Sequence, residues 1–222
     1  MNASKYIILL LQMWVAQGYA QLQVHEEPLH HPVLTKSGVR VLDVIAYPND
    51  TSLIHQHSSN YVYVTINGGK IWVENAGEQG RALVLPKGFI GGYFENPTTP
   101  LIHRFANRSE GLLRLIAVEN LSVHGAKDTS YHFLPNEELL INNAFFIVSK
   151  FRLSPKSRLD FLTFHSTVVV NLNQWPLTVR IQKHPEVLED WKYIDKQSKI
   201  RIYNRQSEET TIVLIRLKQV AD

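Results

Sequence analysis

Cysteine is absent from all 222 residues, so disulfide bonds contribute nothing to the stability of this chain. A chain of this length has ample material for a hydrophobic core, which must therefore hold the fold alone. A strong excess of one charge is also absent, because 23 basic and 20 acidic residues leave a formal charge of only +3. No basic run is interleaved with aromatic residues, so we expect no nucleic-acid partner.

A long hydrophobic run is missing too, since the apolar stretch near the N-terminus is too short for a stable membrane span. Residues 1–20 instead have the pattern of a cleaved signal peptide. Lys5 provides the positive charge, an apolar core follows, and Gly18-Tyr19-Ala20 forms a small-x-small cleavage site. We therefore expect a secreted or periplasmic protein cleaved after Ala20, and the lack of cysteine favours a periplasm. An uncleaved amphipathic anchor is the alternative.

The most informative stretch places two histidines in a segment rich in β-branched and aromatic residues. Strand side chains alternate between two faces, so His55 and His57 point the same way, together with Tyr61 and Tyr63. Asn67-Gly68-Gly69 then predicts a tight hairpin. Both faces of this strand are apolar around Tyr61, which predicts that a second sheet or a partner subunit covers its outer face.

A second stretch, about thirty-five residues after that turn, places His103, Phe105 and Asn107 on one face by the same alternation. Short strands separated by Gly, Pro and Asn turns continue between and around the two stretches, without a long helical period. This texture indicates an all-β fold, either a small barrel or a jelly roll.

The two stretches resemble the paired signatures of the cupin family, G-x5-H-x-H-x3/4-E-x6-G and G-x5-P-x-G-x2-H-x3-N. His55 and His57 match the ligand pair of the first signature, while His103 and Asn107 match the end of the second. The resemblance implies a β-barrel in which His55, His57 and His103 bind a divalent transition metal. Three neutral imidazoles suit Fe, Mn, Ni, Cu or Zn and leave coordination positions open for a substrate.

Two departures from the signatures shape the expected site. The glutamate ligand is absent, because Tyr61 and Val62 stand where it should be. We take Tyr61 as the catalytic residue, and the sequence leaves open whether it is a proton donor, a ligand or a plug. A long segment rich in Gly, Pro and aromatic residues, 89–102, separates Gly88 from His103 and predicts a loop at the barrel mouth. The expected substrate pocket is lined by Tyr63, Tyr93, Phe105 and Asn107.

The second half of the chain looks like a worn repeat of the first. In the registration that aligns the valine run at 168–170 with the strand after the H-x-H motif, His55, His57 and His103 correspond to Phe161, Thr163 and Ile200. We therefore expect a bicupin with one metal site and one structural half, and a single cupin with an unrelated β extension is the alternative. The expected segments are a signal peptide (1–20), an extended arm (21–35), barrel 1 (36–122), a connector with one short helix at 135–141 (123–144) and a degenerate barrel 2 (145–222).

The arm contains His30 and His31, which we interpret as solvated residues rather than as a metal-capture site. Three-histidine cupins are similar in this respect to thiol and diketone dioxygenases. The first functional hypothesis is therefore an exported metal enzyme, of dioxygenase, lyase or isomerase type, that acts on a small organic substrate. The alternatives are an exported module that binds a sugar or other small molecule, and a structural cupin without activity. Cupins commonly pair their sheets, so we also expect contact between copies of the chain.

Overall fold

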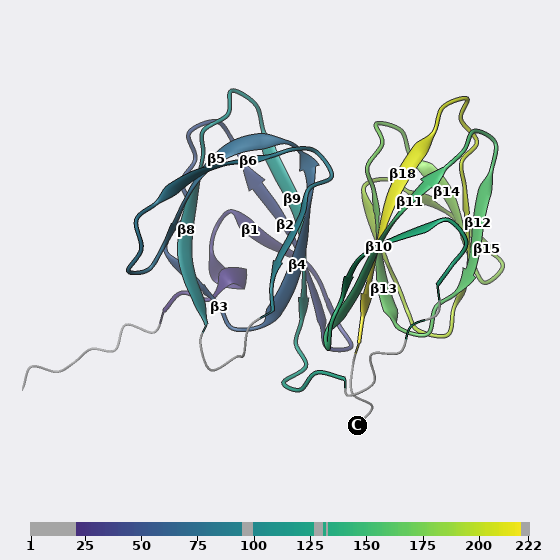
Figure 1. The fold of residues 1–222 in the computed structure, drawn as a ribbon, viewed down its shortest axis with the longest axis horizontal. Coiled ribbons are helices and arrows are strands. Elements are labelled where there is room, and N and C mark those ends of the chain that lie inside the picture. Colours follow the sequence, from purple (N-terminus) through teal and green to yellow (C-terminus); the bar gives the residue numbers. More distant parts are fainter. Residues whose placement is uncertain (1–20, 95–99, 127–130, 132, 219–222) are drawn as a thin grey trace, which may run out of the picture.

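The protein consists of two β-barrels that lie side by side, as Figure 1 shows for the computed structural model. The structure describes residues 21–94, 100–126, 131 and 133–218. Within these ranges the sole helical element is the 3-10 turn η2 (Val24–Glu26), and the rest is strand and loop. The all-β prediction is thereby confirmed. No helix in the described ranges is long and apolar enough to cross a membrane.

Each barrel is built from a five-stranded and a four-stranded antiparallel sheet. In barrel 1 the five-stranded sheet has the order β1 (His30–Lys36), β2 (Val39–Ala46), β9 (Leu113–Asn120), β4 (Asn60–Asn67) and β7 (Ile90–Tyr93). Its four-stranded sheet has the order β3 (His55–His57), β8 (Leu101–Asn107), β5 (Gly69–Asn75) and β6 (Arg81–Leu85).

Barrel 2 repeats this topology strand for strand. Its five-stranded sheet has the order β10 (Glu137–Asn142), β11 (Phe146–Leu153), β18 (Thr210–Leu217), β13 (Ser166–Asn171) and β16 (Trp191–Ile194). Its four-stranded sheet has the order β12 (Arg158–Leu162), β17 (Lys199–Tyr203), β14 (Leu177–Ile181) and β15 (His184–Leu188). Register agrees as well, because His55 pairs with His103 in barrel 1 and Phe161 pairs with Ile200 in barrel 2.

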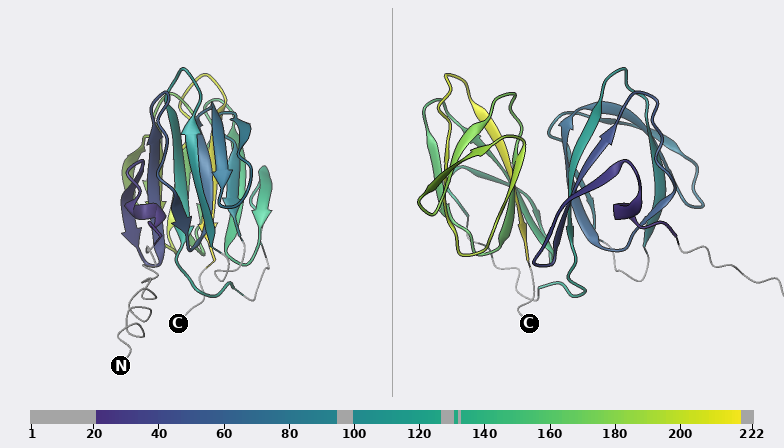
Figure 2. Two further views of the ribbon diagram at one scale, coloured as in Figure 1. Left: turned by 90° about the vertical axis from the view of Figure 1, so that its left-hand side faces the viewer. Right: turned by 180° about the vertical axis from the view of Figure 1, so that it is seen from behind.

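The two five-stranded sheets face each other and share one hydrophobic core (Figure 2). Val62 and Val64 of β4 are fully buried in this core, together with Val168 and Val170 of β13. The apolar outer face that the sequence predicted for the strand around Tyr61 is thus covered by the second barrel of the same chain. Burying each such side chain contributes about 1.5–3 kcal/mol, so the interface is a substantial part of the core. Contact between copies of the chain stays a prediction.

The predicted connecting helix is wrong. Residues 137–142 form β10, in which half-buried and exposed residues alternate along the strand. This period-2 pattern is that of a strand with one covered face. Of the residues that suggested a helix, Pro135 lies in the turn before the strand and the acidic Glu137 and Glu138 are its first residues. The strand that matches β10 in barrel 1 is β1. Most of β1 falls within the segment expected to form an extended arm, and it pairs with β2 instead of lying over the barrel.

The predicted hairpin at Asn67-Gly68-Gly69 is also wrong. β4 and β5 lie in different sheets, so the chain crosses between sheets at these glycines. A Cβ on Gly68 would lie 2.8 Å from the backbone nitrogen of Lys87, so close backbone contact, not a positive φ, requires glycine there. The segment expected to be one strand from His55 to Asn67 is divided into the two strands β3 and β4. Part of the expected mouth loop also forms a strand, the short β7, which pairs with β4.

Candidate metal centre

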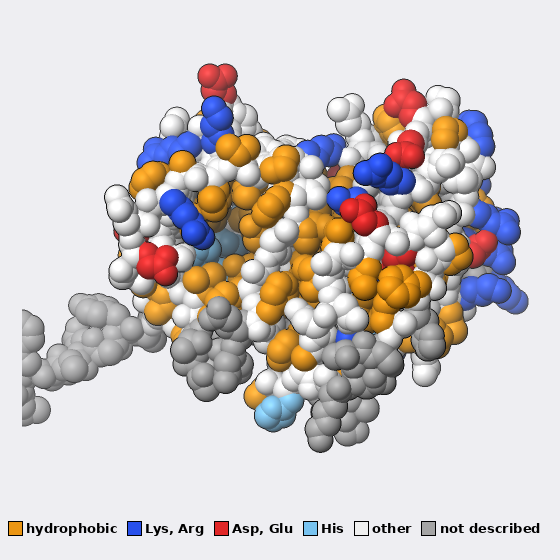
Figure 3. All heavy atoms as spheres, viewed as in Figure 1, with side chains coloured by type: hydrophobic (Ala, Val, Ile, Leu, Met, Phe, Trp, Pro, Cys, Tyr) orange, Lys and Arg blue, Asp and Glu red, His pale blue; other side chains and the backbone are white. Residues whose placement is uncertain are grey.

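Barrel 1 contains a cavity of about 730 Å³ that opens on the face shown in Figure 3, where histidine side chains lie at the bottom of a hollow. Apolar side chains from both sheets form most of its wall: Val44, Ile71, Val73, Leu83, Leu85, Phe105, Leu113, Leu115 and Ala117. Its polar lining includes His30, His57 and His103, three tyrosines, Asn75, Glu78 and Arg81. The cavity therefore suits a small, largely apolar molecule with a few polar groups.

The three predicted ligands lie together: His57 and His103 line this cavity, and His55 is fully buried beside them. His55 and His57 project from β3, and both are buried. His103 projects from β8, directly opposite His55 in the antiparallel pair. The ring centroid of His103 lies 4.7 Å from that of His55 and 4.9 Å from that of His57. Sequence reasoning thus placed these three imidazoles correctly relative to one another.

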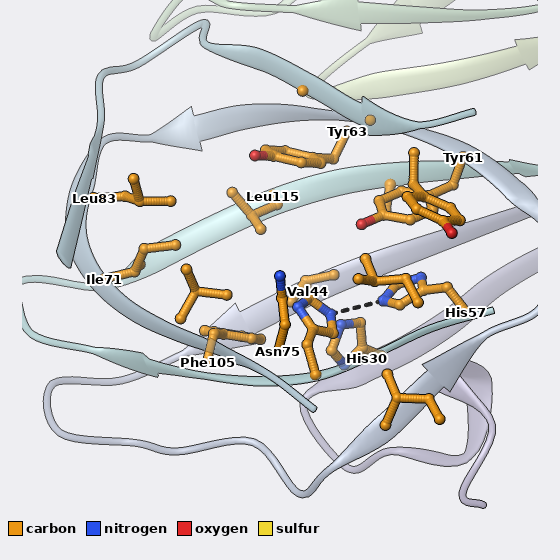
Figure 4. A pocket seen from close by; sticks show the side chains of 18 of the residues that line it. His30, Val44, His57, Tyr61, Tyr63, Ile71, Asn75, Leu83, Phe105 and Leu115 are labelled. Atoms are coloured by element: carbon orange, nitrogen blue, oxygen red, sulfur yellow. Dashed lines mark hydrogen bonds between the residues drawn. The ribbon is translucent and has the colours of Figure 1, made fainter. Parts of the chain in front are cut away.

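A fourth histidine, His30 of β1, joins the cluster (Figure 4). One nitrogen each of His30, His55 and His57 lies within 4.8 Å of the others, and all three residues are buried. The expectation that the His30-His31 pair is solvated is correct for His31, which is exposed, and wrong for His30. The signal that could have found His30 is the strand alternation itself, which sends two adjacent residues to opposite faces.

The donor atoms of these imidazoles fit a transition metal. His55 Nδ1 lies 2.9 Å from the carbonyl oxygen of Leu53, whereas His55 Nε2 and His57 Nδ1 are buried without a partner among the described residues. The Nε2 atoms of His57 and His103 are 3.0 Å apart. Two nitrogens bound at right angles to one ion, each about 2.0–2.1 Å from it, would be separated by about 3.0 Å.

Burial keeps these histidines neutral, which is the protonation state that binds a metal. Burial and the adjacent His30 lower the pKa of His55 to about 4. Burial and His55 lower the pKa of His103 to about 3, and burial with the other imidazoles holds the pKa of His57 well below its usual value. His55, His57 and His103 are therefore uncharged at neutral pH and need not release a proton before an ion binds.

Tyr61, the predicted catalytic residue, stacks on His57 with a centroid distance of 4.2 Å and an interplanar angle of 22°. Burial, together with Tyr63 and Glu119, raises the pKa of Tyr61 above its usual value, so the phenol stays protonated at neutral pH. The phenol can therefore donate a hydrogen bond or a proton toward the cavity that it lines. Figure 4 shows Tyr61 and Tyr63 on the wall across from His30.

Of the predicted pocket residues, Tyr63, Tyr93 and Phe105 line the cavity. Asn107 has a different position. Its side-chain amide donates to the carbonyl oxygens of Ala46 and Gly111, each at 2.9 Å. Asn204 of barrel 2 makes the matching bonds to Leu153 and Glu208, so this asparagine holds a turn in both barrels whether or not histidines are present.

No protein-family model and no curated protein matches this chain. Solved structures do match it. AerE from Microcystis aeruginosa has a TM-score of 0.63 at 11% identity, with 87% of this chain and 99% of that chain covered. A cupin 2 conserved barrel domain protein from Leptotrichia buccalis has a TM-score of 0.56 at 12% identity, with 85% of this chain and 88% of that chain covered. Salicylate 1,2-dioxygenase from Pseudaminobacter salicylatoxidans has a TM-score of 0.60 at 12% identity, with 81% of this chain and 70% of that chain covered. The chain therefore has the cupin fold, as its histidine motifs indicate, in a two-barrel form.

Proposed function

We propose that this protein is a metal-dependent enzyme that acts on a small organic substrate in the cavity of barrel 1, as an oxygenase, a lyase or an isomerase. The observation that carries the proposal is the cluster of four imidazoles at the cavity of barrel 1, in which the Nε2 atoms of His57 and His103 face each other at 3.0 Å. Buried polar atoms without partners destabilise a fold, so their presence here needs a compensating ligand. A transition metal between the Nε2 atoms of His57 and His103 would also satisfy the partnerless His55 Nε2, and it would supply Lewis-acid or redox chemistry.

The residues of the chain have separate roles in this proposal. His55, His57 and His103 hold the ion. Tyr61 and Val62 stand at the position of the missing glutamate, so that position supplies no carboxylate ligand. Tyr61 provides a protonated phenol beside His57 for hydrogen bonding or proton transfer. The apolar wall excludes water from the substrate.

Two observations support an aromatic or otherwise apolar carboxylic acid as the substrate class. The lining combines apolar side chains with Tyr61, Tyr63 and Tyr93, which offer ring faces to a flat molecule. Arg81 lines the same cavity, and within the described ranges no carboxylate is paired with it. Salicylate 1,2-dioxygenase, a structural neighbour, has been solved as an adduct with gentisate, which is an acid of this kind.

The experiment uses the chain from Gln21 onward, produced without a histidine tag and reconstituted with Fe(II), Mn(II), Ni(II), Cu(II) or Zn(II). We expect about one equivalent of metal, and turnover of one member of a panel of aromatic acids, followed with and without O₂. The double variant His55→Ala/His57→Ala is the control and should bind no metal. Failure of every ion to bind would contradict the proposal. Metal binding and ligand binding without turnover would favour the alternative, a binding module whose aromatic lining holds a sugar or other small molecule.

We also propose that the protein is exported, on the basis of the signal-peptide pattern in residues 1–20, which lie outside the described ranges. The mass of the protein recovered from the periplasm or medium of an expressing cell tests this. A chain beginning at Gln21 is expected, and a full-length chain retained in the cells would contradict it.

A further inference from the structure

The segment before β1 is held against the histidine strand. The carbonyl oxygen of Leu22 accepts a hydrogen bond from the amide of Gln56 at 2.8 Å, in the middle of β3. Gln23 and Gln56 form a parallel bridge, and the amide of Ile45 donates to the carbonyl oxygen of Leu29. Residues 22–29 are therefore part of barrel 1, and their backbone is held beside β3 and β2.

Glu27 is the buried charged group of this segment, with 2% of its surface exposed. Its Oε2 lies 2.5 Å from His30 Nδ1 and accepts the amide of Leu29 at 2.9 Å, while Oε1 accepts the amide of Leu53 at 3.0 Å. Glu27 thus accepts two backbone amides and the Nδ1–H of His30, which leaves Nε2 as the nitrogen of His30 that is free for another ligand.

The peptide groups of Leu53 connect two imidazoles. The amide of Leu53 donates to Glu27, which holds His30, and its carbonyl oxygen accepts from His55 Nδ1. His30 and His55 are thus both held through Nδ1, and both have Nε2 available on rings whose centroids are 4.6 Å apart. A metal-binding histidine is commonly oriented in this way, with its other nitrogen bonded to a carboxylate or a backbone carbonyl.

We propose that His30 is a fourth imidazole ligand of the metal centre and that Glu27 is the positioning residue that orients it. This inference rests on the proposed metal centre of barrel 1. The N-terminal segment, outside both histidine signatures, thereby completes the site and occupies one coordination position that three ligands would leave open.

Barrel 2 provides an internal comparison for this pair. Val44 of β2 and Phe151 of β11 occupy equivalent positions in the two barrels. His30, the first residue of β1, pairs with Val44, and Glu137, the first residue of β10, pairs with Phe151, so Glu137 corresponds to His30. Leu134 precedes Glu137 by three residues, as Glu27 precedes His30. The Glu27–His30 pair is therefore present in barrel 1, which has the other three histidines. Barrel 2 has the same fold with Leu134 and Glu137 at these positions, so the fold itself does not require the pair.

The first experiment compares Co(II) binding by the chain from Gln21 onward with that of three variants: His30→Gln, Glu27→Gln and the control His31→Gln. His31 is exposed on the opposite face of β1, so its replacement matches the chemistry without touching the cluster. Dissociation constants are measured by competition with a chelator, visible absorption reports the ligand set, and circular dichroism confirms folding. We expect about 10- to 100-fold weaker binding and an altered spectrum for His30→Gln and Glu27→Gln, and no change for His31→Gln.

A second measurement needs no variant. Electron paramagnetic resonance of the Cu(II)-loaded, unmutated protein counts the imidazole nitrogens on the ion, and we expect four. A count of three, or wild-type Co(II) affinity and spectrum in His30→Gln, would overturn the fourth ligand while leaving the proposed function intact. Weaker binding by His30→Gln with wild-type behaviour of Glu27→Gln would overturn the positioning role of Glu27. If the unmutated protein binds neither ion, both proposals fail.

Discussion

The two barrels have the same strand order and the same registers, and yet among the described residues the histidine cluster lies in barrel 1, beside a cavity of about 730 Å³. The positions of His55, His57 and His103 are occupied in barrel 2 by Phe161, Thr163 and Ile200. Phe161 and Ile200 are buried in a hydrophobic core, and the Thr163 hydroxyl bonds to the carbonyl oxygens of Asp195 and Ser198. The comparison teaches that this fold needs no imidazoles at these positions.

The interiors of the two barrels differ in how completely side chains fill them. Val44 and Leu115 line the cavity of barrel 1, and their equivalents in barrel 2 are Phe151 and Ile212. Phe151 is 1% exposed and packs with Leu159, Phe161 and Ile202 in a continuous core. A larger side chain at one wall position, and apolar residues in place of imidazoles, therefore close the space that barrel 1 keeps open.

The largest expected effect comes from giving barrel 1 the residues of barrel 2. The triple variant His55→Phe/His57→Thr/His103→Ile should lose all bound metal and keep its fold, because barrel 2 already accommodates these side chains. Elemental analysis and circular dichroism measure the two outcomes. Retention of about one equivalent of metal would mean that the cluster is not the binding site.

The same variant should remove an acid sensitivity. In the metal-free protein the folded-state pKa values of His55 and His103 lie near 4 and 3, below the unfolded value of 6.5. The unfolded chain therefore binds more protons as the pH falls from about 6.5 to about 4, and the free energy of unfolding decreases over this window by about 1.4 kcal/mol per pH unit for each group. Urea titrations at several pH values test this. An equally steep decrease in the triple variant would contradict the assignment to these histidines.

A matched pair of truncations sharpens the contrast between the filled and the open interior. Ile212→Ala should lower the free energy of unfolding by about 2–5 kcal/mol, because Ile212 is fully buried and its removal leaves a void. Leu115→Ala should lower it by about 2 kcal/mol or less, because Leu115 already borders a cavity and has fewer contacts to lose. Denaturant unfolding of both variants measures the difference. Equal losses would show that the cavity is closed in solution.

The smallest effect concerns an ion pair between the barrels. Arg114 of β9 bonds to Asp43 within barrel 1 and to Asp190 of barrel 2, the latter at 2.6 Å. Because Asp190 is partly exposed, Asp190→Asn should cost only about 0.5–1 kcal/mol, and less at high salt. Unfolding at low and high ionic strength measures it. A loss of several kcal/mol would mean that polar contacts, and not the shared apolar core, hold the barrels together.

Much of the fold could be predicted from local patterns. The short strands expected between Gly, Pro and Asn turns are present, and the registration of the repeat agrees with the pairing of Phe161 and Ile200. The errors occur where a local signal had two explanations. Gly68 allows a close backbone approach, although glycine after asparagine also predicts a hairpin. Likewise, Pro135 and Glu137 resemble a helix start but precede and begin the strand β10.

For the site, the sequence by itself determined that His55 and His57 share a face, because strand periodicity is a local property of the backbone. It also indicated His103 through the spacing of a second signature. Only the tertiary structure decided that His30 and Glu27 join them and that Asn107 turns away to hold a loop. The physical reason is that β1 reaches the cluster through its pairing with β2, and such long-range pairing depends on how whole sheets pack.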